Sequence, residues 1–128
     1  MNPRFTLPLI LTALAIFGCG RSAPPVDPNA PSGEVRVKLE MPDGKSRQVD
    51  VPGVRAGETV LSVMQRIPGV EYQGDGSTAM VTRIGEFSTS ASEGWTFYVN
   101  DHWADRSPGV YQVEPGDTIH WRYGVFSP

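Results

Sequence analysis

The feature that most constrains this chain is an aromatic block in which large and polar residues alternate. The alternation runs from 95 to 100 in Trp-Thr-Phe-Tyr-Val-Asn and again from 118 to 123 in Thr-Ile-His-Trp-Arg-Tyr. Successive side chains of a strand point to opposite faces of a sheet, so this period of two predicts two half-buried strands. The pair Asn100-Asp101 tolerates positive φ and predicts a tight hairpin turn between strands. The block therefore predicts a small antiparallel sheet with an aromatic core.

The chain before that block predicts a hairpin followed by one short helix. Apolar and polar residues alternate from 35 to 40 and again from 48 to 51, on either side of Pro42-Asp43-Gly44, which predicts a hairpin with one apolar face. Residues 56–59 predict a turn and a helix cap. The apolar residues that follow recur at helical spacing up to Pro68-Gly69: Val60, Leu61, Met64 and Ile67. They predict a helix of about two to three turns.

Further short strands are expected at 70–72 and 79–84, and the polar stretch 85–93 is expected to be a mobile loop. A helix this short is marginal in water on its own, so its apolar face must pack on the sheet. The predicted fold class is α+β: a β-grasp-like mixed sheet packed on one short helix. The core residues expected on the strands are Val35, Val37, Leu39, Trp95, Phe97, Val99, Ile119 and Trp121.

The amino terminus predicts export. A short positive start precedes residues 5–17, an almost wholly apolar run that is too short to span a bilayer comfortably and is typical of a secretory signal. The single cysteine follows in Ile16-Phe17-Gly18-Cys19, which resembles the bacterial lipobox, where the chain is cleaved before the cysteine and the cysteine is lipidated. Lipidation would also account for a lone thiol that can form no internal disulfide. The alternative is an ordinary signal peptide with a chance cysteine nearby.

The predicted domain organisation is a lipoprotein signal peptide at 1–18, a lipidated Cys19 with a proline-rich tether at 19–33, and one folded domain at 34–128. Several acyl chains on one cysteine bury enough methylene groups to anchor a protein stably in the membrane. In Gram-negative lipoproteins an Asp after the cysteine favours retention in the inner membrane. Gly20 stands there, so the resemblance implies an outer-membrane anchor with the domain facing the periplasm, if the host is Gram-negative.

Composition and motifs exclude several classes of function. The 128 residues are 39% hydrophobic and 20% charged, which fits one ordinary globular domain. A net charge of −3 without any cluster of Lys and Arg offers no footprint for nucleic acid. His102 and His120 lack a second ligand at metal-binding spacing, and the sequence has no nucleophile elbow and no phosphate-binding glycine loop. We therefore expect no catalysis, no metal and no cofactor.

Several segments together resemble the transcobalamin-like C-terminal domain, a β-grasp-like module. The resemblance spans about residues 34 to 126 and rests on Gly57-Glu58-Thr59-Val60-Leu61, Gly94-Trp95, Phe97-Tyr98-Val99-Asn100, Tyr111, Gly116-Asp117, Ile119, Trp121 and Tyr123. It implies a binding module, since in the vitamin carriers this domain closes over cobalamin opposite a helical domain. Because that helical domain is missing here, and because 78–81 replaces the carriers' aromatic ligand-facing hairpin, the resemblance implies a helical partner in trans or a different ligand.

The candidate ligand-binding residues are the aromatic side chains that the core does not require: Tyr98, Trp103, Tyr111 and Tyr123. Their surface is either a binding face or a second minor core. The leading expectation is an anchored lipoprotein that binds a small molecule, or a partner presenting one, through the face with Tyr98 and Trp103. The alternative is an envelope adaptor that docks another protein by pairing along an open sheet edge.

Overall fold

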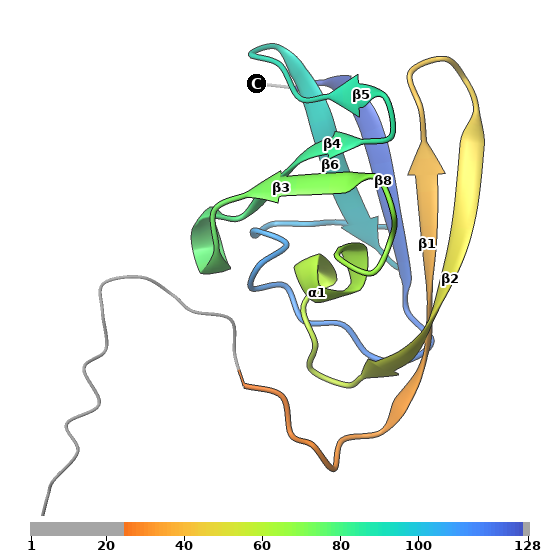
Figure 1. Cartoon of the computed structure of the whole chain (residues 1–128), viewed down its shortest axis with the longest axis vertical. Coiled ribbons are helices and arrows are strands. Elements are labelled where there is room, and N and C mark those ends of the chain that lie inside the picture. The colour runs from red at the N-terminus through yellow and green to blue at the C-terminus, as the bar shows by residue number, and fades with distance from the viewer. Residues whose placement is uncertain (1–24, 127–128) are drawn as a thin grey trace, which may run out of the picture.

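The computed structural model describes residues 25–126. The predicted signal peptide and Cys19 lie outside the described residues. The elements follow in the order β1 (Ser32–Glu40), β2 (Ser46–Arg55), α1 (Val60–Met64), β3 (Val70–Gln73), the 3₁₀ turn η1 (Gly76–Thr78), β4 (Met80–Ile84), β5 (Phe87–Ser88), β6 (Glu93–Val99), β7 (His102–Trp103) and β8 (Thr118–Val125) (Figure 1). The predicted α+β class is confirmed, with strands predominating. No helix within 25–126 has the length and apolar character needed to cross a membrane.

The strands form two sheets. The larger has the order β2-β1-β8-β6-β7, in which β1 and β8 run parallel and the other neighbours antiparallel, so it is mixed as predicted. The smaller is antiparallel with the order β3-β4-β5 and was not expected as a separate sheet. Figure 1 shows its strands running across the long strands β6 and β8, next to α1. The small sheet and α1 together cover one face of the large sheet.

The stretch 85–93 is not the simple loop that the sequence predicted. Ile84 pairs with Phe87 across a turn in which Gly85 has a φ of +62°, and this creates β5. Phe87 is half-buried, and its carbonyl oxygen accepts a hydrogen bond from Trp95 Nε1 at 2.9 Å. A partner on β6 therefore organises a segment whose composition indicates only a loop.

Helix α1 is shorter than predicted. It ends at Met64, and the chain continues with tighter hydrogen bonds from Arg66 N to the Val63 carbonyl and from Ile67 N to the Met64 carbonyl. Bonds of this i to i+3 type belong to a 3₁₀-like turn and not to an α-helix. The apolar face is nevertheless the predicted one, because the four predicted residues are buried: Val60, Leu61, Met64 and Ile67.

The core lies between the large sheet and the layer formed by α1 and the small sheet. The eight strand residues that the sequence assigned to the core are each at most 6% exposed. Each Val, Leu, Ile or Phe side chain removed from water in this way contributes about 1.5–3 kcal/mol. The period-two prediction for β1, β6 and β8 is therefore confirmed.

The junction between β2 and α1 is organised by a nearly buried carboxylate. Glu58 accepts hydrogen bonds from Arg55 N at 2.5 Å and from Ser62 Oγ at 2.8 Å, and it forms an ion pair with Arg66. Thr59 is the predicted cap, since its Oγ1 accepts a hydrogen bond from Ser62 N at 3.2 Å. The Thr59 contact satisfies a helix N–H group, Ser62 N, that has no partner within so short a helix, while the Glu58 contacts hold the residues on either side of it together.

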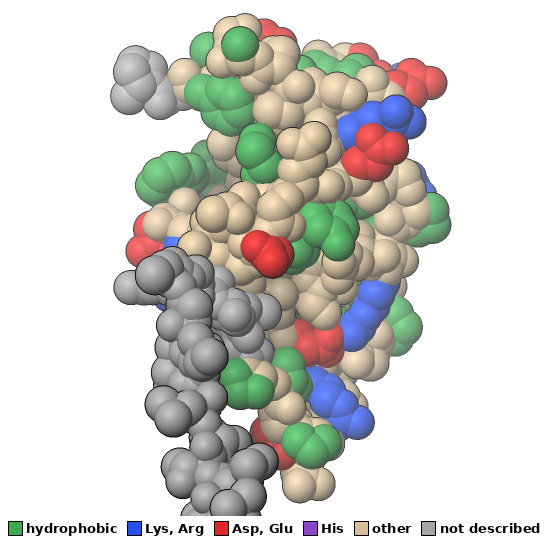
Figure 2. Space-filling view, turned by 60° about the vertical axis from the view of Figure 1, so that its left-hand side comes forward, with side chains coloured by type: hydrophobic (Ala, Val, Ile, Leu, Met, Phe, Trp, Pro, Cys, Tyr) green, Lys and Arg blue, Asp and Glu red, His purple; other side chains and the backbone are tan. Residues whose placement is uncertain are grey.

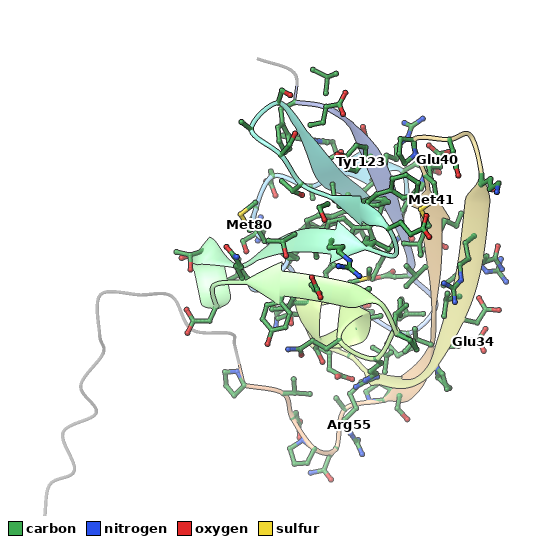
Figure 3. All side chains as sticks on the ribbon, turned by 45° about the horizontal axis from the view of Figure 1, so that its top comes forward. Glu34, Glu40, Met41, Arg55, Met80 and Tyr123 are labelled. Atoms are coloured by element: carbon green, nitrogen blue, oxygen red, sulfur yellow. The ribbon has the colours of Figure 1, made fainter. Side chains whose placement is uncertain are left out.

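The beginning of the domain extends into the predicted tether. β1 begins at Ser32, just before the boundary predicted at 34. Arg55 Nη1 donates hydrogen bonds to the carbonyl oxygens of Pro28 and Ala30, at 2.6 and 3.3 Å. Figure 3 shows Arg55 beside the chain that leads into β1. The end of the proline-rich segment is therefore attached to the folded domain.

Candidate functional site

An apolar hollow of about 160 Å³ opens where the two sheets meet. It is lined by residues of β4, β6, β7 and β8 and of the segments that follow β7 and β8: Met80, Val81, Trp95, Thr96, Phe97, Trp103, Ala104, Pro108, Trp121 and Phe126. We refer to this set as the apolar hollow. Figure 2 shows that hydrophobic side chains reach the surface in several separate groups. In Figure 3, Met80, which lines the apolar hollow, lies far from Glu40, the last residue of β1.

The apolar hollow has a buried floor and an exposed rim. Trp95, Phe97 and Trp121 form the floor and are at most 6% exposed. On the rim, the exposed fractions are 44% for Met80, 66% for Trp103 and 40% for Phe126. These three are the majority of the five large apolar side chains that are exposed within 25–126. Exposed apolar side chains gathered over an apolar depression are typical of a binding site.

The floor is held rigidly. The rings of Phe97 and Trp121 have centroids 4.8 Å apart with a tilt of 32°, and those of Trp95 and Tyr123 meet edge to face at 5.3 Å and 73°. Trp95 Nε1 is also hydrogen-bonded to the Phe87 carbonyl. Aromatic contacts of this geometry add about 0.5–1.5 kcal/mol each beyond the buried area. The floor is thus formed before any ligand arrives.

One wall depends on a close approach of two backbone segments. Ser107 Oγ lies 2.7 Å from the Ala79 carbonyl oxygen and 3.0 Å from that of Gly76, and it accepts a hydrogen bond from Gly109 N at 3.1 Å. A Cβ atom added to Gly109 would lie 2.2 Å from the Gly76 carbonyl oxygen, so only glycine fits there. This contact holds the segment that contains Pro108 against the start of β4.

The floor contains an unusual polar atom. Trp121 is 2% exposed, and its Nε1 has no hydrogen-bond partner among the described residues. It is the one buried side-chain nitrogen or oxygen in this condition within 25–126. Native proteins pair almost all buried polar groups, so such an atom requires an explanation.

Two of the predicted binding residues are neighbours across β6 and β7. Tyr98 is the register partner of Trp103. Tyr98 lies on the outer face of the large sheet, where its ring is 6.2 Å from that of His120 and the Arg122 guanidinium stands 5.6 Å from its centroid. Of the four predicted binding residues, only Trp103 lines the apolar hollow.

The other two predicted residues pack on the inner side of the sheet. The Tyr123 hydroxyl donates to the Ser88 carbonyl at 2.8 Å, and its ring contacts Trp95. Tyr111 meets Phe97 edge to face, with centroids 5.6 Å apart. Both side chains therefore connect parts of the core, away from the face with Tyr98.

Sequence reasoning did not assign a role to most of the rim. Of the rim residues, Met80 lies on β4 and Phe126 lies after β8, far apart in the chain. The buried lining residues Ala104 and Pro108 follow the hairpin turn. The available signal was weak, because no local pattern distinguishes these apolar residues from others on strands and in turns. Only the arrangement of the two sheets brings these residues to one place.

The outer face of the large sheet carries a polar cluster. Glu40 Oε2 accepts a hydrogen bond from Arg122 Nε at 2.7 Å, and its Oε1 lies 3.2 Å from His120 Nε2. The hydrogen bond from Arg122 holds the pKa of Glu40 below its ordinary value of 4.5, and partial burial opposes this effect. In residues 25–126 no group of three or more His, Cys, Asp or Glu side chains is arranged to hold a metal ion. The cluster thus acts as a surface ion-pair network.

The fold and the apolar hollow define a small β-grasp-like domain with an apolar depression where its two sheets meet. The chain belongs to the family described as a domain of unknown function, DUF4430, whose model matches residues 57–124. A comparison with curated proteins returned no match.

Two solved structures share this fold. A candidate metal-binding protein from Ruminococcus gnavus ATCC 29149 matches with a TM-score of 0.66 and 11% identity, over 74% of this chain and 99% of that chain. Haptocorrin in complex with Cbi matches with a TM-score of 0.65 and 17% identity, over 76% of this chain but only 26% of haptocorrin. At these identities the similarity establishes the fold alone. It agrees with the predicted likeness to the transcobalamin-like domain.

Proposed function

We propose that this protein is a non-catalytic binding domain that takes an apolar, ring-sized group of a small ligand into the apolar hollow. The observation that carries the proposal is the exposed rim of Met80, Trp103 and Phe126 above a rigid, buried aromatic floor. Exposing such a rim to water is unfavourable unless another molecule covers it.

The size of the apolar hollow limits what it can hold. Its volume of about 160 Å³ is close to the roughly 150 Å³ of a cavity that holds benzene, and below the roughly 300–1,000 Å³ of a site that encloses a whole drug-sized ligand. A larger molecule, such as a cobalamin-like ligand, would insert one group here and need a second protein over the remainder. A helical partner in trans is the arrangement we favour, since this fold is 26% of the haptocorrin chain solved with Cbi.

The test is a titration of the purified chain with isopropylbenzene, monitored through the intrinsic fluorescence of the tryptophans. The floor tryptophans should report a saturable change. Met80→Asp, which places a charge on the rim, should weaken binding at least about tenfold, because an apolar ligand would have to cover a carboxylate that is exposed to water in the free chain. Tyr72→Asp is the matched control: Tyr72 is 42% exposed on β3 but does not line the apolar hollow. No saturation, or equal weakening by both variants, would refute the proposal.

We further propose that the domain is carried on a lipid anchor at Cys19, at the outer membrane if the host is Gram-negative. The support is the sequence Ile16-Phe17-Gly18-Cys19 after an apolar run. Growth with a labelled fatty acid should label the wild-type protein and leave Cys19→Ser unlabelled and absent from the membrane fraction. A labelled Cys19→Ser protein would contradict the anchor.

A second candidate function, docking of an envelope protein along a sheet edge, is favoured by the position of β2. This strand forms one edge of the large sheet, and Pro52 removes a backbone donor only from its later part. If the adaptor hypothesis holds, a photo-cross-linking residue in place of Gln48 would capture one specific protein. If the ligand-binding proposal holds, the same residue in place of Trp103 would capture the helical partner. Capture from neither position would exclude both protein partners.

A further inference from the structure

The three tryptophans differ in how their indole N–H groups are satisfied. Trp95 Nε1 donates to the Phe87 carbonyl at 2.9 Å, and Trp103 is 66% exposed to solvent. Trp121 is 2% exposed, and its Nε1 has no partner among the described residues. Trp121 also lines the apolar hollow. The unpaired donor therefore belongs to a residue of the proposed binding site.

An unpaired indole N–H in a core costs free energy that a phenylalanine at the same position would not. Trp121 contacts Phe97 through its ring, a contact that phenylalanine could also make. Packing therefore accounts for a large ring at this position, but not for a ring that carries an unpaired N–H group. A ligand that brings a hydrogen-bond acceptor to Nε1 would account for it.

The charges around the site restrict the kind of acceptor. The residues that line the apolar hollow include no Lys, Arg or His. An anionic acceptor would thus be buried without a counter-charge, which is far less favourable than burial of a neutral carbonyl or ring nitrogen. A neutral acceptor needs only one donor, and the one unpaired donor among the buried side chains of 25–126 belongs to a floor residue, Trp121.

We propose that the apolar hollow selects a neutral ring-sized group that carries a hydrogen-bond acceptor, such as a ketone, an amide carbonyl or a ring nitrogen, and that Trp121 Nε1–H binds the acceptor atom. The inference rests on the proposed function, because it names the chemistry of the ligand at the same site. It assigns Trp121 a role in specificity besides its role in the core.

The experiment compares three probes of similar size on the purified chain: acetophenone, isopropylbenzene and benzoate. Acetophenone should bind about 2- to 10-fold more tightly than isopropylbenzene, which corresponds to one net hydrogen bond. Benzoate should bind more weakly than acetophenone. In ¹⁵N–¹H spectra, acetophenone should move the indole resonance of Trp121 downfield. The other two indole resonances are identified by their loss in Trp103→Phe and in Trp95→Phe.

A variant adds a second measurement. In Trp121→Phe the ratio of acetophenone to isopropylbenzene affinity should fall to about one, because the donor is gone. Should that variant fail to fold, the indole resonance of the wild-type chain still decides the question. Equal binding of both probes with an unmoved Trp121 resonance, or preference for benzoate, would overturn this inference and leave the proposed function standing. Binding of no probe would instead remove the proposed function itself.

Discussion

Phe97 on β6 and Trp121 on β8 are register partners whose ring centroids lie 4.8 Å apart. Both belong to the core and also form the floor of the apolar hollow. The residues that hold the large sheet to its covering layer are therefore the residues that a ligand would contact. Floor substitutions must be judged first by stability, and rim substitutions give the cleaner test of binding.

The two buried tryptophans, Trp95 and Trp121, should differ in how much free energy of unfolding is lost when each is replaced by phenylalanine. Trp95→Phe removes the donor of a 2.9 Å hydrogen bond to the Phe87 carbonyl, whereas Trp121→Phe removes a donor without a partner in the described part of the chain. We expect Trp95→Phe to lower the free energy of unfolding by about 1 kcal/mol more than Trp121→Phe. Urea unfolding followed by circular dichroism measures both, and a larger loss in Trp121→Phe would contradict the assignment.

Glu58 should be the most sensitive polar position of the domain. Glu58→Ala leaves Arg55 N, Ser62 Oγ and Arg66 without their shared acceptor, and we expect a loss of about 2–3 kcal/mol in the free energy of unfolding. Arg66→Ala is the control. The Arg66 side chain is 38% exposed, so its removal leaves two donors in place and should cost less than about 1 kcal/mol. Equal costs would mean that the ion pair, and not the shared carboxylate, holds this junction.

The hairpin turn allows two positive-φ residues to be compared. Asn100 and Asp101 have φ angles of 49° and 67°. Asp101→Gly should raise the free energy of unfolding by up to about 1 kcal/mol, because glycine adopts such angles without strain. Asn100→Gly should lower it by about 1–2 kcal/mol, since it removes the side-chain Nδ2 that donates to Asp117 Oδ1 and the side-chain Oδ1 that accepts from Thr118 N, each at 2.9 Å. Thermal unfolding measures both, and stabilisation by Asn100→Gly would contradict the role of these bonds.

Stability should fall in acid partly through Glu40. The Arg122 hydrogen bond lowers the pKa of Glu40 in the folded state, so the ionised carboxylate stabilises the fold above its ordinary pKa of 4.5. That contribution is lost as the pH falls through the lowered value. Because the pair is about half exposed, it amounts to about 0.2–1 kcal/mol. The difference in free energy of unfolding between wild type and Glu40→Gln should shrink from pH 7 to pH 3 and also with added salt; a difference that grows in acid would refute the coupling.

Local patterns predicted much of this architecture. The alternation at 95–100 and 118–123 determined which side chains of β6 and β8 are buried, because the two-residue period of a strand is a property of the backbone itself. The turn at Asn100-Asp101 and the cap at Thr59 were predictable for the same reason. Each depends on a few consecutive residues.

Predictions failed where distant partners decide the outcome. β5 forms in a stretch that reads as a loop, because β4 pairs with it and Trp95 bonds to its backbone. The surroundings of Tyr123 were likewise not predictable, since the structure packs its ring between Phe87 and Trp95 on the inner side of the sheet. The alternation alone does not reveal this, since it says nothing of the small sheet above.

The sequence by itself determined the fold class and the buried faces of the strands. It is also the basis on which we expect an exported, anchored chain. Only the tertiary structure decided that Met80, Trp103 and Phe126 surround one depression and that the indole nitrogen of Trp121 has no partner within the described chain. The physical reason is that a strand's periodicity is local, whereas a binding site is made by side chains that sheet pairing and the stacking of two sheets bring together.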